Sequence, residues 1–227
     1  MITVAQARPS DRALFIRRTY THLAGAVGAF IAVEFILFAT GLAEVLFNLI
    51  AGSRFMWLAI LGGFALMGWV ARSLIAQAKS GEQQYLGLGL YVVGEAIIFA
   101  PILYIATYFT DGNVIPTAAA LTLLLFAGLT TVAFTTKTDF SFLRGILTIG
   151  SFVALGLIGC SIIFGFTLGL VFSGVMVIFA SAAILYDTSK IMHHYSTSQH
   201  VAASLELFAS VALLFWYVLR IVMAMRR

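Results

Sequence analysis

Long apolar runs separated by short polar breaks dominate the chain. A window of about 19 residues places seven candidate membrane-spanning helices on these runs. The runs are continuously apolar, whereas the strands of a membrane β-barrel alternate apolar and polar residues, so a barrel is disfavoured. The clearest breaks fall at residues 78–82, 110–113, 135–139 and 187–200. The seven helices are expected at residues 22–40, 55–71, 85–108, 114–134, 143–164, 168–186 and 202–224.

Two boundaries need a separate argument. Residues 143–186 form one apolar stretch that would measure about 66 Å as a helix, roughly twice a bilayer core, so we expect a turn at residues 165–167. Arg17 and Arg18 precede the first apolar stretch, as they would in a secretory signal. That stretch is too long for a signal and lacks a clear cleavage site, so we expect a retained first helix after a cytoplasmic segment, residues 1–20.

The composition agrees with a membrane protein. The chain is 62% hydrophobic and 10% charged, against roughly 45–50% and about 25% in globular proteins, and its mean hydropathy is +1.05. One cysteine excludes a disulfide scaffold and a zinc finger. Neither a phosphate-binding loop, a serine-hydrolase elbow nor a nucleic-acid footprint is found, so no cofactor and no nucleic-acid partner are expected. Residues 1–227 are therefore interpreted as one transmembrane domain in a lipid bilayer.

The lysines and arginines predict a cytoplasmic N-terminus, because cytoplasmic loops are enriched in them. With the N-terminus inside, nine fall on the cytoplasmic side and three outside, and Arg220 lies within the last helix. The Arg226 and Arg227 pair disagrees with this balance, and a re-entrant last segment would be the alternative. The nine are Arg8, Arg12, Arg17, Arg18, Arg72, Lys79, Lys137, Arg144 and Lys190, and the three are Arg54, Arg226 and Arg227.

Four carboxylates lie in or at the ends of the expected spans. An ionisable group inside a membrane costs at least about 2.5–3.5 kcal/mol, so each is a candidate functional residue. Asp187 closes the expected sixth span, where it is either a boundary residue in contact with the cytoplasm or a buried group compensated by nearby positive charge. The candidates for that charge are Lys190, His193, His194 and Arg72. The other three carboxylates are Glu34, Glu95 and Glu206.

The helical spacing and the histidines add further candidates. Glu206 and Ser210 are four residues apart and share one face of the last helix, although a serine there is also explained by helix packing. His193, His194 and His200 crowd one loop without a metal-binding spacing, so no metal site is expected. Proton-sensitive positive charge near Asp187 is the preferred interpretation of the histidines.

Several segments resemble the Bax inhibitor-1 family of membrane proteins. They are residues 119–130 (AALTLLLFAGLT), residues 134–143 (FTTKTDFSFL), residues 184–191, which begin with ILYD and are followed by His193, and the run from Glu95 to Pro101. The resemblance extends over essentially the whole chain in length and span number. It implies an all-α fold in which six helices surround a central seventh, a pH-sensitive calcium leak, cytoprotection in eukaryotes and, in some bacterial relatives, modulation of a membrane-anchored AAA protease.

The resemblance also implies roles for particular residues. Calcium-leak members use two aspartates that share a proton, on helices six and seven, and an arginine latch on helix two. Asp187 matches the first aspartate, and Arg72 matches the latch with an offset of about one residue. Ser210 stands where the second aspartate belongs, so the pair is broken here, and Glu206, one turn away, is the candidate replacement. A lone Asp187 is expected to be held by Arg72.

Three functions follow as hypotheses. The first is a membrane protein, in the plasma or inner membrane if bacterial, that passes or senses calcium or protons through a bundle gated near Asp187. The alternative is a non-conducting modulator of a membrane protease or a stress or cell-death pathway, with the arginine-rich N-terminus as its contact. The third, an intramembrane hydrolase, needs histidines converging from different helices, so we expect no enzyme.

Overall fold

The apolar runs form helices throughout the computed structural model, which describes residues 3–77, 81–136 and 138–226. Lys79, Lys137 and Arg227, which entered the charge balance, lie outside the described residues. The described elements are η1 (Val4–Gln6), α1 (Pro9–Ala39), α2 (Leu42–Ala51), α3 (Arg54–Ala76), α4 (Gly81–Tyr108), α5 (Val114–Thr136), η2 (Phe140–Phe142), α6 (Leu143–Phe164), α7 (Gly169–His193) and α8 (His200–Met225).

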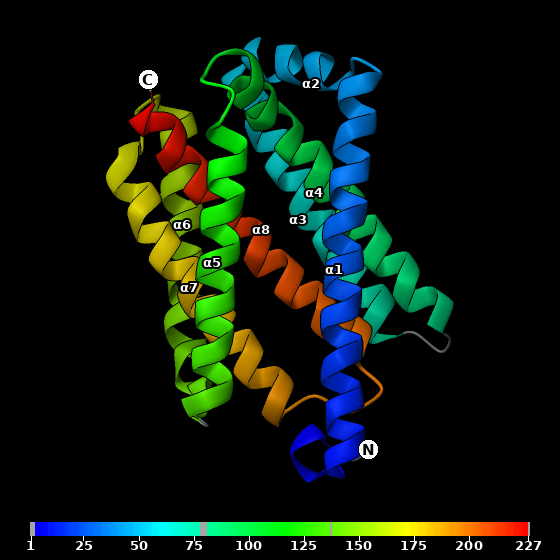
Figure 1. The fold of residues 1–227 in the computed structure, drawn as a ribbon. Coiled ribbons are helices and arrows are strands. Elements are labelled where there is room, and N and C mark those ends of the chain that lie inside the picture. The colour runs from blue at the N-terminus through cyan, green and yellow to red at the C-terminus, as the bar shows by residue number, and fades with distance from the viewer. Residues whose placement is uncertain (1–2, 78–80, 137, 227) are drawn as a thin grey trace.

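Seven of the described helices are long and apolar enough to cross a membrane, in agreement with the seven expected spans. The eighth, α2, was not predicted. Its ten residues would measure about 15 Å, half of a bilayer core, so it cannot span. Gly41, whose φ of 77° lies in the left-handed region, turns the chain between α1 and α2. Figure 1 shows α2 lying across the end of the bundle opposite the N-terminus.

Two helix boundaries differ most from the predictions. The first helix starts at Pro9, not at residue 22, and the arginines of residues 12–18 lie on it. Helix α7 continues through Asp187 to His193, so Asp187 is not a terminal residue. Hydropathy identifies only the apolar middle of a span. Helices α1 and α7 continue into polar residues beyond that middle, so hydropathy underestimates their length. The turn between α6 and α7 is confirmed, because α6 ends at Phe164 and Gly165 follows with a φ of 75°.

Helix α8 runs obliquely through the interior (Figure 1) and packs against α1, α3, α4, α5 and α7, as expected for a central helix. Leu207, Leu214 and Leu219 on α8 are fully buried. Helix α4 is buried to a similar degree and shares the interior with α8, while α6 packs on the outside against α7 and α3. The continuous α8 leaves no re-entrant last segment, and the two termini lie at opposite ends of the bundle.

Candidate functional site

Asp187 and Ser210 meet in the interior of the bundle. Asp187 lies on α7 and Ser210 on α8, and each is only 8% exposed. The Ser210 hydroxyl donates a hydrogen bond of 2.5 Å to Oδ2 of Asp187. Ser210, which is predicted from the sequence to stand at the position of the second aspartate, therefore faces Asp187 as a neutral donor. Serine stabilises the carboxylate through this hydrogen bond, whereas a second carboxylate would repel it.

A second contact joins the same two helices near their ends. Lys190 Nζ lies 2.8 Å from Oε2 and 3.0 Å from Oε1 of Glu206. Because Lys190 follows Asp187 by three residues and Glu206 precedes Ser210 by four, the two contacts are stacked about one helical turn apart. We call them the outer contact, Lys190 with Glu206, and the inner contact, Asp187 with Ser210. Lys190 thus neutralises Glu206, and the hydrogen bond to Asp187 comes from Ser210.

Arg72, on α3, lies beside these contacts. Its guanidinium carbon is 5.6 Å from the centre of the Tyr91 ring, and its charge acts on Asp187. Among the described residues no ion pair joins Arg72 to Asp187. Arg72 is therefore a neighbouring cation of Asp187 in this structure, its role as a latch stays a prediction, and the hydrogen bond to the buried carboxylate comes from Ser210. Arg72 lies on α3, so its distance from Asp187 depends on how α3 packs against α4 and α8.

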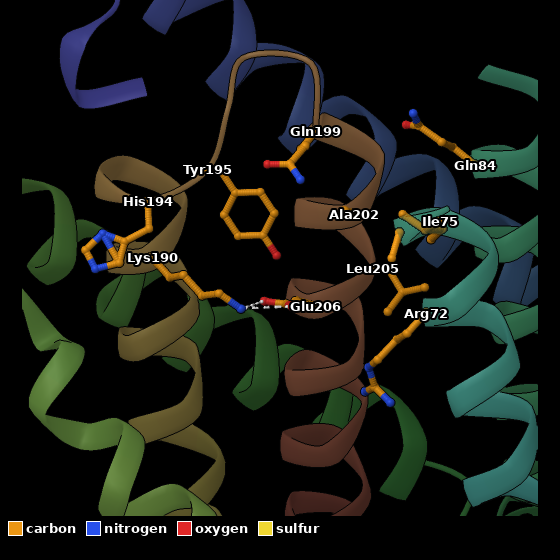
Figure 2. Close-up of a pocket in the computed structure, with 11 residues that line it drawn as sticks. Arg72, Ile75, Gln84, Lys190, His194, Tyr195, Gln199, Ala202, Leu205 and Glu206 are labelled. Carbon is orange, nitrogen blue, oxygen red and sulfur yellow. Dashed lines mark hydrogen bonds and ion pairs between the residues drawn. The ribbon is translucent and has the colours of Figure 1, made fainter. Parts of the chain in front are cut away.

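The outer contact lines a cavity of about 350 Å³. Figure 2 shows Lys190 and Glu206 joined across it, with the Tyr195 hydroxyl directed toward Glu206 and Arg72 entering from α3. Burial and the neighbouring negative charge of Glu206 raise the pKa of Tyr195 far above its ordinary value, so the hydroxyl keeps its proton. Asp187 is not among the residues that line this cavity, and the ion pair that does line it lies about one helical turn from Asp187.

Glu95 and Glu34 occupy different surroundings. Each is 7% exposed. Tyr91 precedes Glu95 by one turn of α4, and its hydroxyl interacts with both Glu95 and Arg72, so Glu95 joins the group around Arg72. Both carboxylate oxygens of Glu34, on α1, lack a hydrogen-bond partner among the described residues. Three of the four candidate carboxylates therefore gather near Arg72, and Glu34 lies apart from them.

The three histidines predicted to share one loop have different partners in the structure. His193 Nδ1 lies 2.9 Å from the Ser189 carbonyl oxygen, and His194 Nε2 lies 4.0 Å from Oδ2 of Asp139. The His200 ring stacks edge-on against His22, with 4.9 Å between their centres. Within the described chain no three His, Cys, Asp or Glu side chains converge in a way that could hold a metal ion.

Two of the segments that carry the family resemblance, residues 134–143 and 184–191, contact each other. The Phe140 N–H donates to Ser189 Oγ at 3.0 Å, and Ser189 Oγ donates to Asp139 at 3.3 Å. Asp139 also accepts a 3.0 Å bond from the Ser141 N–H. These hydrogen bonds, led by the one from Ser141, lower the pKa of Asp139 below its ordinary value. These hydrogen bonds hold α7 in place at Ser189, two residues after Asp187.

Sequence reasoning missed Tyr91, Tyr195 and Ser189 as members of this site. Tyr91 could have been found, because it lies one turn before Glu95 on the same helix face. The other two are placed by contacts between distant segments, for which the sequence carries no local signal. Lys190 was considered only as one of several cations near Asp187, and the structure gives it Glu206 as its partner.

The comparisons with known proteins identify the family to which the chain belongs. A protein named Bax inhibitor 1 from Schizosaccharomyces pombe is 29% identical over 96% of this chain and 79% of its own length. The Golgi anti-apoptotic protein of vaccinia virus is 27% identical over 96% of this chain and 89% of its own. A Pseudomonas aeruginosa protein is 41% identical over 48% of this chain, and the match spans about half of its length. The model of the family described as inhibitor of apoptosis-promoting Bax1 matches residues 12–227, so the chain belongs to the Bax inhibitor family.

Proposed function

We propose that this chain forms a proton-sensitive cation leak through its helix bundle, with calcium as the ion to be tested. The observation that carries the proposal is Asp187, a carboxylate buried in the bundle interior beneath an ion pair that lines a cavity. A membrane protein keeps a carboxylate at this depth at a considerable cost in free energy, which favours a functional role over a purely structural one. In this proposal the outer contact covers the inner contact. Protonation of Asp187 then changes the path that an ion takes between the two contacts.

Calcium would be bound only weakly here. The ion prefers six to eight oxygen ligands, whereas the inner contact offers one carboxylate and one hydroxyl. Glu206 is engaged by Lys190, and Glu95 is grouped with Tyr91 and Arg72. Weak coordination is compatible with passage, because a conducting site must release the ion it binds. We therefore propose transient contact with calcium or protons.

The experiment is calcium influx into vesicles that contain the full chain and an entrapped calcium dye, measured from about pH 5 to about pH 8, the range in which histidine-like groups titrate. We expect a pH-dependent influx whose pH dependence is lost in Asp187→Asn, which mimics the protonated acid. Asp111→Asn, the same change at an exposed aspartate, is the matched control and keeps the wild-type profile. Influx equal to that of empty vesicles at every pH contradicts the leak.

A second candidate function is a modulator that binds a membrane-anchored protease or a cell-death partner without conducting ions. The observation that favours it is the polar start of α1, where Arg8 and Arg17 are exposed and Arg12 is partly exposed. The viral relative is named for an anti-apoptotic role, which is compatible with such a function.

One variant that keeps the fold distinguishes the two candidate functions. Removing the whole segment would also remove the buried Val4 and Phe15, so we replace Arg8, Arg12 and Arg17 with Gln. A modulator loses binding to a purified membrane-anchored AAA protease, and its vesicles show no influx. A leak keeps its influx in this variant, and a wild-type chain that neither conducts nor binds contradicts both functions.

A further inference from the structure

The outer surface formed by α1 and α4 carries an apolar groove of about 380 Å³. Small residues make it hollow: Gly25 and Ala29 line it from α1, and Gly89 lines it from α4. A Cβ atom added at Gly25 or Gly89 would meet no other atom within 4 Å. Val93, also in the lining, is 43% exposed. Both helices are membrane spans, so this groove opens toward the acyl chains of the lipid.

One end of the groove is polar. His22 Nδ1 lies 2.6 Å from the Arg18 carbonyl oxygen, and because a carbonyl only accepts, this nitrogen carries the hydrogen. His22 Nε2 lies 2.9 Å from the Tyr85 hydroxyl, and the two rings stack with 5.5 Å between their centres. In neutral His22 the Tyr85 hydroxyl is therefore the donor. These contacts tie α1 to α4 at the polar end of the groove.

The charge at this end is positive. Arg18 is exposed, and no carboxylate among the described residues lies within 4 Å of its guanidinium. Both Arg18 and His22 act electrostatically on His200, whose ring contacts His22, so the three basic side chains lie together. The groove lining contains no Asp or Glu. Arginine and tyrosine at the end of a membrane helix are typical of the headgroup level of a bilayer.

We propose that this groove binds one anionic glycerophospholipid. An acyl chain lies between α1 and α4 along Gly25, Ala29 and Gly89, and the phosphate accepts a hydrogen bond from the Arg18 guanidinium beside the contact between His22 and Tyr85. The occupant must be amphipathic, because the groove is apolar along its length and basic at one end. Free phosphate would leave the apolar part empty, and a zwitterionic lipid would bring its own positive charge to Arg18. The proposal is independent of whether the chain conducts ions.

The test uses the full chain purified in detergent and incubated with equal amounts of phosphatidylglycerol and phosphatidylcholine, with bound lipid counted by native mass spectrometry. We expect wild type to retain phosphatidylglycerol preferentially. Arg18→Ala is expected to reduce that retention about fivefold, the effect typical of one basic residue at an anionic membrane surface. Gly89→Leu is expected to reduce it as well, because the new side chain fills the groove.

Matched controls separate the site from general effects. Arg17→Ala removes the same charge about 100° around the helix, and Gly128→Leu adds the same side chain on α5, where a Cβ meets nothing within 4 Å. Both are expected to retain lipid as wild type does. Ala29→Leu fills the groove from α1 and keeps the test available should Gly89→Leu fail to fold.

Three outcomes would overturn the proposal. The first is equal retention of the two lipids by wild type. The second is phosphatidylglycerol retention that stays unchanged when Arg18 is replaced and when the groove is filled. The third is displacement of the bound lipid by inorganic phosphate, because the site would then recognise phosphate alone.

Discussion

At the scale of single residues, the partner of a buried carboxylate decides what that carboxylate can do. Asp187 accepts a hydrogen bond from Ser210, which supplies a proton donor and no charge. One turn toward the helix ends, Glu206 is neutralised by Lys190. Asp187 therefore has a neutral donor as its partner, and Glu206 has a cation. The resemblance to calcium-leak proteins predicts two facing acids at the inner contact instead. This difference makes Ser210 the most informative position to change.

Ser210→Asp would recreate two facing carboxylates. Two adjacent carboxylates cannot both ionise easily, so they share a proton, and the pH at which influx is half-maximal is expected to move toward neutrality by roughly one unit or more. The measurement is the pH profile of calcium influx into vesicles. Ser210→Asn, of similar size and uncharged, is the control and should not move the midpoint. An unchanged midpoint in Ser210→Asp would show that Asp187 does not control the pH response.

Asp139 gives a pH prediction for stability. Its pKa is lowered in the folded chain, so the stabilisation is present above its unfolded pKa of about 4 and is lost as the pH falls through the folded value. We expect Asp139→Asn to have a slightly lower Tm than wild type at neutral pH, the effect being small because the side chain is 46% exposed and screened. The difference should vanish once the pH is below the lowered pKa of Asp139 in the folded chain.

Thermal unfolding in detergent at several pH values measures this difference, and Asp111→Asn controls for the loss of one negative charge. A difference between Asp139→Asn and wild type that is equal at neutral and acidic pH would mean that the amide substitution, and not the ionised acid, is responsible.

At the scale of elements, the close packing of α3 on α4 sets the position of Arg72. A Cβ atom at Gly87 would lie 2.9 Å from the carbonyl oxygen of Ala71 and 2.7 Å from Ile75, so only glycine lets the two helices approach this closely. Ala71 directly precedes Arg72, and Tyr91, whose ring lies under the guanidinium, follows Gly87 by one turn. The small residue on α4 therefore brings Arg72 within electrostatic reach of Asp187 and Glu95.

Gly87→Ala is expected to separate α3 from α4 and to destabilise the chain by about 1–3 kcal/mol, the usual cost of overpacking. The backbone carbonyl of Ala71 cannot move aside as a side-chain end could. The measurement is thermal unfolding in detergent. Gly128→Ala, at a position with open space, is the control and should be neutral or slightly stabilising. A Tm for Gly87→Ala equal to that of the control would contradict the close contact.

At the scale of the whole molecule, seven spans place the two termini at opposite ends of the bundle. The end that holds the start of α1 also holds the ends of α3 and α7 and the start of α8, so the arginines of α1 lie on the same side as Arg72 and Lys190. Arg226, at the end of α8, lies on the opposite side. Because basic residues favour the cytoplasm, the cavity with its outer contact is expected to open there.

Cysteine labelling tests this orientation. In a Cys160→Ala background, Ser10→Cys lies at the N-terminal end and Asn113→Cys lies in the connection at the other end, and both positions are exposed. A membrane-impermeant maleimide applied to intact cells is expected to label Asn113→Cys, and to label Ser10→Cys only after permeabilisation. The reverse pattern would place the N-terminus outside.

The sequence alone determined the features that depend on local composition. Seven apolar stretches of sufficient length predicted seven spans, because a helix must cover a fixed thickness of hydrocarbon. The same reasoning located the turn at Gly165, where an apolar run was too long for one crossing. Glu34 and Glu95 were recognisable as buried acids, because charged residues stand out against apolar neighbours, whereas the burial of Asp187 was left open until α7 was seen to continue beyond it.

Only the tertiary structure decided which of these groups meet. Pairing Lys190 with Glu206, and Asp187 with Ser210, requires α7 and α8 to take one particular rotation about their axes. The hydropathy of a chain that is apolar on most faces does not specify that rotation. The short helix α2, the separation of the histidines and the groove between α1 and α4 depend in the same way on contacts between segments far apart in the chain. A local pattern determines where a helix lies along the sequence, and packing determines which of its sides faces a neighbour.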